Sequence, residues 1–307
     1  MSDDRLRIGV SACLAGEQVR FDGGHKQDEF VASLGAFADL VAVCPEMEIG
    51  LGAPRESMRL VRREDRIALV APRTGRELTA EMLAYGQRKA DEIAALDLDG
   101  FVVKKDSPSC GMERVRIYGD SGIPERSGRG LFTAALLAAL PLLPVEEEGR
   151  LRDAALRENF LTRTRLFHRA RRLLAGEWRI ADVIAIHATV KLELLAHSPV
   201  AYRALGRLIA RAAQLPREEL ATSYLEGLME ALAIVPSRGR HVNVLQHVAG
   251  YFSRGVTSDE RQEIRELIAE YEEDRAPRST PLTLLRHHAR RSGNAYLLQQ
   301  AYLQRGV

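Results

Sequence analysis

The sequence predicts an α/β domain with a mainly parallel, Rossmann-like sheet, followed by an all-α domain. In the first half, short apolar runs alternate with helical patterns, as in consecutive βαβ units. In the second half, the periodic segments have the spacing of helices. The length of 307 residues suits two domains of about 150 residues each. We place these domains at residues 1–147 and 148–307.

The apolar runs of the first half have the length of buried strands. The expected strands are residues 6–12, 40–44, 100–104 and 142–145, and residues 59–71 are expected to form an extended pair. The expected helices are residues 29–38, 80–96 and 131–140. Thr79 would cap the second of these helices, and a Gly-rich loop, residues 119–130, would precede the third.

Residues 146–150, Glu-Glu-Glu-Gly-Arg, are charged and lack apolar periodicity, so we expect them to link the two domains. The helices expected after this linker are residues 151–175, 180–196, 201–213, 217–234, 241–252, 258–274, 281–292 and 295–304. Prolines lie at the breaks between these helices, where a helix cannot continue. These prolines are Pro199, Pro216, Pro236, Pro277 and Pro281.

The composition is that of an ordinary soluble globular protein, with 46% hydrophobic and 28% charged residues. The first residues lack the pattern of a signal peptide, and no apolar stretch approaches the roughly 20 residues of a membrane span. We therefore expect a cytoplasmic protein without a membrane partner.

Charge is distributed unevenly along the chain. Residues 1–145 contain 19 basic and 22 acidic residues, a net charge of −3, which leaves 25 basic and 20 acidic residues, a net charge of +5, for the rest. Almost all of this positive charge is arginine, which suits phosphate recognition. A GC-rich genome would encode the same bias, so charge alone is weak support for a nucleic-acid partner.

Three cysteines are the candidate centre of function. Cys13, Cys44 and Cys110 each lie at or beyond the end of an expected strand. Parallel strands end at one edge of a sheet, where α/β proteins place their sites, so the three sulfurs should gather there. An odd number of cysteines in a reducing compartment disfavours structural disulfides and leaves metal ligation or catalysis. The alternative is three unrelated buried thiols.

The spacing of these cysteines is unlike that of a structural zinc site, which has four ligands and often closely spaced Cys pairs. Three thiolates need a fourth protein ligand, or they leave one coordination position open. An iron–sulfur cube held by three thiolates leaves one iron free to bind an outside ligand and to act as a Lewis acid.

Polar side chains near the cysteines could complete a catalytic site. Glu46 could act as a general base for water, and a nearby serine could relay a proton. The further candidates, which we assign to substrate binding, are Asp22, Lys104 and Ser109. Each group also has an ordinary interpretation, such as a surface charge for Glu46, a turn for the serines and a salt-bridge partner for Lys104.

Four short sequence strings occur in the following order: Ser11-Ala12-Cys13-Leu14, Arg20-Phe21-Asp22-Gly23-Gly24, Cys44-Pro45-Glu46 and Ser107-Pro108-Ser109-Cys110-Gly111. With these strings, residues 5–145 resemble the thiouracil desulfidase family. The resemblance implies a [4Fe–4S] cluster on Cys13, Cys44 and Cys110, whose fourth iron binds the thiocarbonyl sulfur of the substrate. It also implies that Glu46 is the catalytic carboxylate and that Ser107 is its partner. Simpler family members read Gln-Leu-Gly-Gly-Leu after this glutamate, whereas this chain has Met47-Glu48-Ile49-Gly50-Leu51, so Glu48 is a second candidate for the base.

The second half contains seven of the eight histidines. His187 and His197 are ten residues apart, and His241 and His247 are six apart, so neither is an i,i+4 metal pair, and we expect buried or capping histidines. Arginine runs at residues 163–172 and 286–291 are usually solvated faces, although they could follow a phosphate backbone.

This half also resembles a known domain. The strings that carry the resemblance to the YbgA-type helical domain are His187-Ala188-Thr189-Val190-Lys191, Ala196-His197-Ser198-Pro199, Asn243-Val244-Leu245-Gln246-His247 and Thr283-Leu284-Leu285-Arg286-His287-His288. The presence of this helical domain after a desulfidase domain implies that the substrate is 4-thiouridine in tRNA and that the helical domain holds the RNA. A base within tRNA must leave its stack to reach the iron.

We therefore expect a hydrolytic desulfidase of thiolated uracil, most specifically of 4-thiouridine in tRNA, which yields uridine and sulfide. Within the same enzyme class, the alternative substrate is a free thiouracil base or another small thiolated uracil. In another class, the chain would be a non-catalytic iron–sulfur sensor that binds nucleic acid. Glu46 beside a cysteine favours an enzyme, because a sensor needs no general base.

Overall fold

A computed structural model describes residues 5–64, 66–119, 123–252 and 255–304 of the chain. The chain divides into two compact units, Met1–His168 and Arg169–Val307. This division falls inside helix α5 (Ala154–Ala175) and not at residue 147, where we place the domain boundary from the sequence. Phe160, in the first part of α5, belongs to the core of the first unit, which explains the later division.

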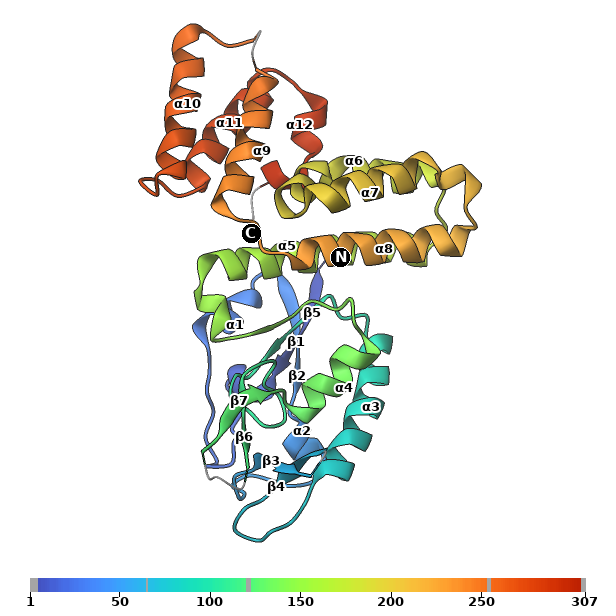
Figure 1. The fold of residues 1–307 in the computed structure, drawn as a ribbon, viewed down its shortest axis with the longest axis vertical. Helices are drawn as coiled ribbons and strands as arrows, with labels where there is room; N and C mark the ends of the chain where they lie inside the picture. The colour runs from blue at the N-terminus through green and yellow to red at the C-terminus, as the bar shows by residue number, and fades with distance from the viewer. Residues whose placement is uncertain (1–4, 65, 120–122, 253–254, 305–307) are drawn as a thin grey trace. The chain divides into compact units, whose positions relative to one another are not determined.

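The first unit contains a four-stranded sheet in which all strand pairs are parallel, with the order β2-β1-β5-β8. The strands are β1 (Leu6–Ser11), β2 (Ala38–Val43), β5 (Gly100–Val103) and β8 (Val145–Glu147). The central strand β1 pairs with β2 on one side and with β5 on the other. The predicted α/β class with a parallel sheet and a helical second half is confirmed (Figure 1).

A second, mixed sheet has the strand order β4-β3-β6-β7. Its strands are β3 (Arg59–Arg63), β4 (Arg66–Val70), β6 (Val115–Tyr118) and β7 (Glu125–Gly128). Strands β3 and β4 form the expected antiparallel pair. Strand β7 lies in the stretch that we expected to be a Gly-rich loop, and its polar composition explains why its pairing with β6 was missed; residues 120–122 of that stretch lie outside the described residues.

The helices of the first unit beside α5 are α1 (Glu29–Leu34), α2 (Pro45–Glu48), α3 (Thr79–Ala95) and α4 (Leu131–Ala139), with 3₁₀ turns η1 (Ala12–Leu14) and η2 (Arg150–Arg152). Asp28 caps α1 by accepting from the N–H groups of Phe30 and Val31. Thr79 does not cap α3, because its hydroxyl accepts a hydrogen bond from Leu69 N at 2.9 Å and so joins the helix to β4.

Apolar side chains cover both faces of the parallel sheet. On one face, Ile8 and Val10 pack with Leu34 of α1 and Phe160 of α5. On the other face, Phe101 of β5 contacts Phe132 of α4, with ring centroids 5.9 Å apart. Figure 1 accordingly draws α1 and the pair α3 and α4 on opposite sides of the sheet. This packing fixes the strand ends on which the candidate site is built.

The expected strand at residues 142–145 and the expected linker after it are corrected by the structure. Strand β8 begins at Val145 and ends at Glu147, and the residues Glu146, Glu147 and Glu148 are each only 6% exposed. Charge suggested a solvated linker, but each carboxylate has an ion-pair or hydrogen-bond partner. Glu146 pairs with Arg150 at 2.6 Å, for example.

The helices of the second unit follow the expected order. They are α6 (Ile180–His197), α7 (Pro199–Ala210), α8 (Arg217–Ala233), α9 (Arg238–Gly250), α10 (Ser258–Glu272), α11 (Ser279–Arg291) and α12 (Ala295–Gln299), with η3 (Ala212–Gln214) and η4 (Ala301–Leu303). Val244, Leu245 and Leu285 lie in their common core. His187, His197 and His288 are buried, as we expected of the histidines in this half, whereas His247 and His287 are exposed.

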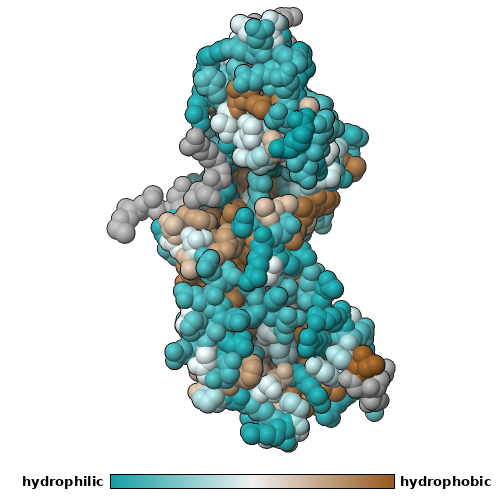
Figure 2. Space-filling model, turned by 90° about the vertical axis from the view of Figure 1, so that its left-hand side faces the viewer, coloured by the Kyte–Doolittle hydropathy of each residue, from teal (hydrophilic) through white to brown (hydrophobic). Residues whose placement is uncertain are grey.

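The surface drawn in Figure 2 is mostly hydrophilic, and its hydrophobic residues form separate patches. In the parts of the chain that the structure describes, no helix combines the length and the apolar character needed to cross a bilayer.

Candidate metal centre and active site

The three cysteines lie beyond three neighbouring strands of the parallel sheet. Cys13 is in η1, directly after β1, and Cys44 follows β2 and precedes α2. Cys110 lies in the loop that leaves β5. All three line one cavity of about 370 Å³. The strand order β2-β1-β5 thus brings together thiols that are far apart in the sequence.

The loop that carries Cys110 is held by side chains and by a close backbone contact. Ser107 Oγ accepts hydrogen bonds from the N–H groups of Ser109 at 3.3 Å and Cys110 at 3.1 Å. Thr133 Oγ1 donates to Cys110 O at 2.6 Å. A Cβ atom at Gly130 would overlap the backbone of Ser109 and Cys110, so this position requires glycine.

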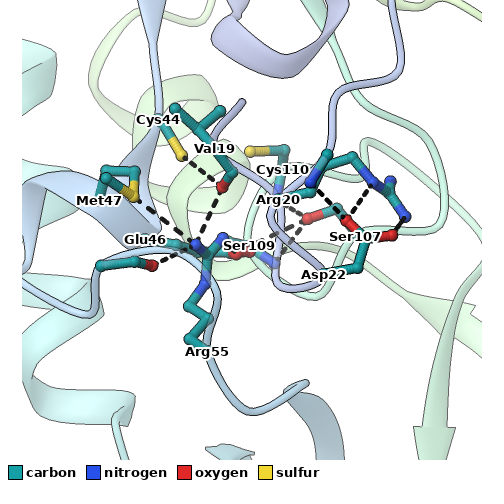
Figure 3. A network of polar contacts seen from close by, with 12 residues as sticks. Val19, Arg20, Asp22, Cys44, Glu46, Met47, Arg55, Ser107, Ser109 and Cys110 are labelled. Atoms are coloured by element: carbon teal, nitrogen blue, oxygen red, sulfur yellow. Dashed lines mark hydrogen bonds and ion pairs between the residues drawn. The ribbon is translucent and has the colours of Figure 1, made fainter. Parts of the chain in front are cut away.

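Glu46 is the acidic centre of a polar network in the cavity wall (Figure 3). One carboxylate oxygen accepts a hydrogen bond from Ser109 Oγ, and the other pairs with Arg55 Nη2. Arg55 Nη1 donates to the carbonyl oxygens of Val19 at 2.9 Å and Gly52 at 2.7 Å. The side chains of Arg55 and Glu46 are 6% and 15% exposed, so the pair is buried and its orientation is fixed.

The structure distinguishes the two candidate bases by their surroundings. Glu46 lines the cavity, whereas Glu48 does not and instead pairs with Lys89 of α3 at 2.7 Å. The serine that contacts Glu46 is Ser109 and not Ser107. Ser107 Oγ lies 3.4 Å from Ser109 Oγ, so it reaches Glu46 through Ser109.

The two remaining candidates have different positions. Lys104 lines the cavity, and its Nζ pairs with Glu148. Asp22 is not among the cavity-lining residues; it binds the side chain of Arg20 at 3.3 Å and accepts from Gly24 N at 3.1 Å. These bonds hold its pKa below the ordinary value for aspartate. Asp22 therefore fixes the turn from which Arg20 reaches the cavity.

Burial raises the pKa of all three thiols. The pKa of Cys13 rises to about 11, and those of Cys44 and Cys110 also lie above the ordinary value. A reactive cysteine nucleophile has a lowered pKa, so these thiols do not have the character of free thiolates. Thiols of this kind give up their protons when a cation binds them, because metal binding and deprotonation are coupled.

The donor set fits a cluster better than a single ion. In the described ranges, no three His, Cys, Asp or Glu side chains come close enough together to hold one metal ion. The three thiols are instead distributed over the wall of one cavity. Thiolates are the ligands that iron–sulfur clusters use, with each thiolate binding a different iron.

Sequence reasoning missed several residues of the cavity. Arg55, Arg20 and Lys26 line it, yet none lies in a short string with a cysteine. Arg55 follows Gly50-Leu51-Gly52-Ala53-Pro54, whose glycines and proline indicate a loop. One sequence signal could have identified Arg55. It is a charged residue in a Gly- and Pro-rich loop, at the edge of the sheet where the cysteines lie.

Comparison with known proteins gives two family matches. Residues 8–148 match the family described as 2-thiouracil desulfurase, and residues 191–305 match DUF1722, a family described as a protein of unknown function. The chain is 30% identical to YbgA of Escherichia coli (strain K12) over 148 residues, which are 48% of this chain and 88% of YbgA. It is 32% identical to YbbK of Bacillus subtilis (strain 168) over 136 residues, which are 42% of this chain and 88% of YbbK.

One solved structure is also similar. It is that of TudS, a [4Fe–4S]-dependent thiouracil desulfidase, with 32% sequence identity and a TM-score of 0.41. The match covers 50% of this chain and 97% of TudS.

Proposed function

The chain belongs to the thiouracil desulfidase family, with a YbgA-type helical domain after the desulfidase domain, and we propose that it is an iron–sulfur enzyme that removes sulfur from thiolated uracil by hydrolysis. One observation carries the proposal: three thiols and a buried, fixed carboxylate line the same cavity. Neither a sensor nor a structural metal site requires that carboxylate.

Cys13, Cys44 and Cys110 would hold a [4Fe–4S] cluster, and none of the described residues near them is a fourth cysteine. When bound, the cluster supplies an iron with an open position, which acts as a Lewis acid toward the sulfur of the substrate. Positive charges from Lys104 and Arg20 act on Cys13, and they would stabilise the thiolate that ligation requires.

Glu46 is the proposed general base. Water in the cavity would give a proton to Glu46, and the hydroxide would form a C–O bond with the thiocarbonyl carbon while the C–S bond breaks. The products are the uracil carbonyl and sulfide, so the reaction needs no oxidant or reductant. Arg55 and Ser109 hold the carboxylate in place for this transfer, and Ser107 extends the chain of hydroxyls from Ser109 to the cavity wall.

The proposed substrate is 4-thiouridine in tRNA. The cavity of about 370 Å³ is near the lower end of the range for small-molecule sites, so it suits a single base and not a stacked helix. An RNA base would therefore have to turn out of its stack to enter. The basic side chains in the wall, Arg20, Lys26 and Lys105, and the net charge of +5 beyond residue 145 suit a phosphate-bearing substrate. A free thiouracil base is the second candidate, because it also fits the cavity.

The test is to reconstitute the protein without oxygen, to measure its iron and sulfide, and to incubate it with tRNA that contains 4-thiouridine and with free 2-thiouracil. Loss of thiouridine with release of sulfide supports the proposal, and turnover of 2-thiouracil alone supports the free base. Glu46→Gln should keep the iron and lower turnover by about 10²- to 10⁴-fold, whereas the control Glu48→Gln should retain turnover. A fully loaded protein that releases sulfide from neither compound would exclude a desulfidase.

A further inference from the structure

Two consecutive buried carboxylates hold both ends of the loop that carries Cys110. This loop comprises residues 104–113. At its start, Glu148 pairs through Oε1 with Lys104 Nζ and accepts through Oε2 from Lys105 N at 2.7 Å. At its end, Glu147 Oε1 accepts from the N–H groups of Met112 at 2.8 Å and Glu113 at 3.3 Å.

Glu147 and Glu148 are both buried, so their contacts show where each carboxylate finds its hydrogen-bond partners. Glu147 and Glu148 are each 6% exposed, and a buried carboxylate is unfavourable unless it is paired or hydrogen-bonded. In the part of the chain that the structure describes, the hydrogen bonds of both carboxylates go to residues 104–113. The two side chains are thus committed to this loop.

The loop needs such anchors for two reasons. It runs from β5 of the parallel sheet to β6 of the mixed sheet, so neither sheet alone fixes its path. Two residues also have a positive φ: Asp106, near the start of the loop, at 58°, and Arg114, directly after its end, at 56°. Non-glycine residues are unfavourable in this left-handed region and stay there only where the surroundings hold them.

We infer that Glu147 and Glu148 are positioning residues of the desulfidase: they fix the two ends of the loop so that Cys110 faces the cavity and Lys104 is held in its wall. Neither carboxylate is among the residues that line the cavity, so both act through the loop. The inference rests on the proposed function, in which Cys110 is a cluster ligand.

The decisive measurement is the rate at which iodoacetamide alkylates Cys110 in the cluster-free full chain, followed by mass spectrometry. Cys110 is 6% exposed, so the reagent reaches it only when the loop opens. Glu147→Ala leaves the N–H groups of Met112 and Glu113 without their acceptor, and Glu148→Ala does the same to Lys105 N. Alkylation should therefore be at least about tenfold faster than in the unmodified chain. Glu147→Gln keeps a carbonyl oxygen as acceptor and should stay within about twofold.

The matched control is Asp28→Ala, which removes the N-cap of α1 and destabilises the same unit without contacting the loop. If the alanine variants alkylate no faster than Asp28→Ala, the carboxylates contribute only general stability and the inference is wrong. Because the readout is made without the cluster and without substrate, it is independent of whether the enzyme is a desulfidase.

A second variant covers the case in which the alanine variants do not fold. Glu148→Gln keeps the acceptor for Lys105 N but leaves the charge of Lys104 unpaired beside the cavity. The reduction potential of the reconstituted cluster should then become more positive, because cluster potentials follow the local net charge. The melting temperature should fall by less than in Glu148→Ala, because the hydrogen bond from Lys105 N is kept. An unchanged potential in this variant would also contradict the inference.

Discussion

Ser109 Oγ donates a hydrogen bond to the carboxylate of Glu46, which joins the loop of residues 104–113 to helix α2 between residues that are 63 positions apart in the chain. Glu46 follows the strand that leads to Cys44, and Ser109 immediately precedes Cys110. The bond therefore connects the surroundings of two cysteines. Its geometry assigns different tasks to the two serines of the Ser-Pro-Ser string.

Replacing each serine separately should distinguish these tasks. Ser109→Ala removes the donor to Glu46, so turnover should fall by roughly tenfold, equivalent to about 1.4 kcal/mol, with little change in iron content. Ser107→Ala removes the acceptor of two backbone N–H groups, so the free energy of unfolding should fall by about 1–3 kcal/mol and iron retention should fall with it. Equal effects of the two substitutions on turnover and on iron would contradict this assignment.

Arg55→Met should be strongly destabilising. The substitution leaves Glu46 buried without its cation and leaves two carbonyl oxygens without their donor. Loss of one partner from a buried pair lowers the free energy of unfolding by about 3–5 kcal/mol. The control is Arg62→Met, because Arg62 and Glu125 are 50% and 57% exposed; its effect should be below about 1 kcal/mol. Denaturant unfolding of both variants measures the difference, and similar losses would disprove the prediction.

Gly130→Ala should displace the backbone that precedes and includes Cys110. The added methyl group has no space, because the neighbours are backbone atoms of Ser109 and Cys110 that cannot rotate away. We expect overpacking to cost about 1–3 kcal/mol, together with weaker iron retention. Gly119→Ala is the control, since no atom lies within 4 Å of a Cβ atom placed there. Iron analysis after gel filtration compares the two variants, and full retention in Gly130→Ala would be the contrary result.

The helical unit should lose stability in mild acid. Burial lowers the pKa of His187 to about 4 and that of His241 to about 4, against an ordinary 6.5. At pH values between these two pKa values, the unfolded chain binds protons that the folded chain does not. The free energy of unfolding is therefore highest above about pH 6.5 and declines as the pH falls toward 4.

Thermal unfolding at several pH values from 7 to 4 measures this decline, which should be at most on the order of 3 kcal/mol per histidine. His187→Gln should reduce the slope of stability against pH. His287→Gln, at an exposed position, should leave the slope unchanged. A slope that is the same in all three proteins would rule out His187 as a source.

The strands that carry the cysteines were predictable because apolar runs and Gly or Pro punctuation mark them directly. The parallel direction of these strands then followed from the alternation of strands and helices, whereas the order of the strands in the sheet did not. Strand β8 was misplaced because two of its three residues are glutamates, and charge normally indicates solvent. Several of their partners, such as Lys104 and Met112, come from another segment, and sequence periodicity cannot reveal such pairing.

The same limitation applies to the candidate site. The resemblance pointed to Glu46 with Ser107 as its partner, whereas the serine that contacts the carboxylate is Ser109. Arg55 was missed because its importance comes from burial against Glu46 and from two carbonyl oxygens. Asp22 was assigned to the substrate from its neighbours in the sequence, whereas its side chain turns back to Arg20 and Gly24.

The order of β2, β1 and β5 also determines when a cofactor can be acquired. Cys13, Cys44 and Cys110 come together only after three strands separated by long stretches of chain have paired, and such non-local pairing is slow. A small zinc finger folds around its metal, because its ligands are close in sequence. Here apolar side chains cover both faces of the sheet, so we expect the fold to form first and the cluster to be inserted afterwards.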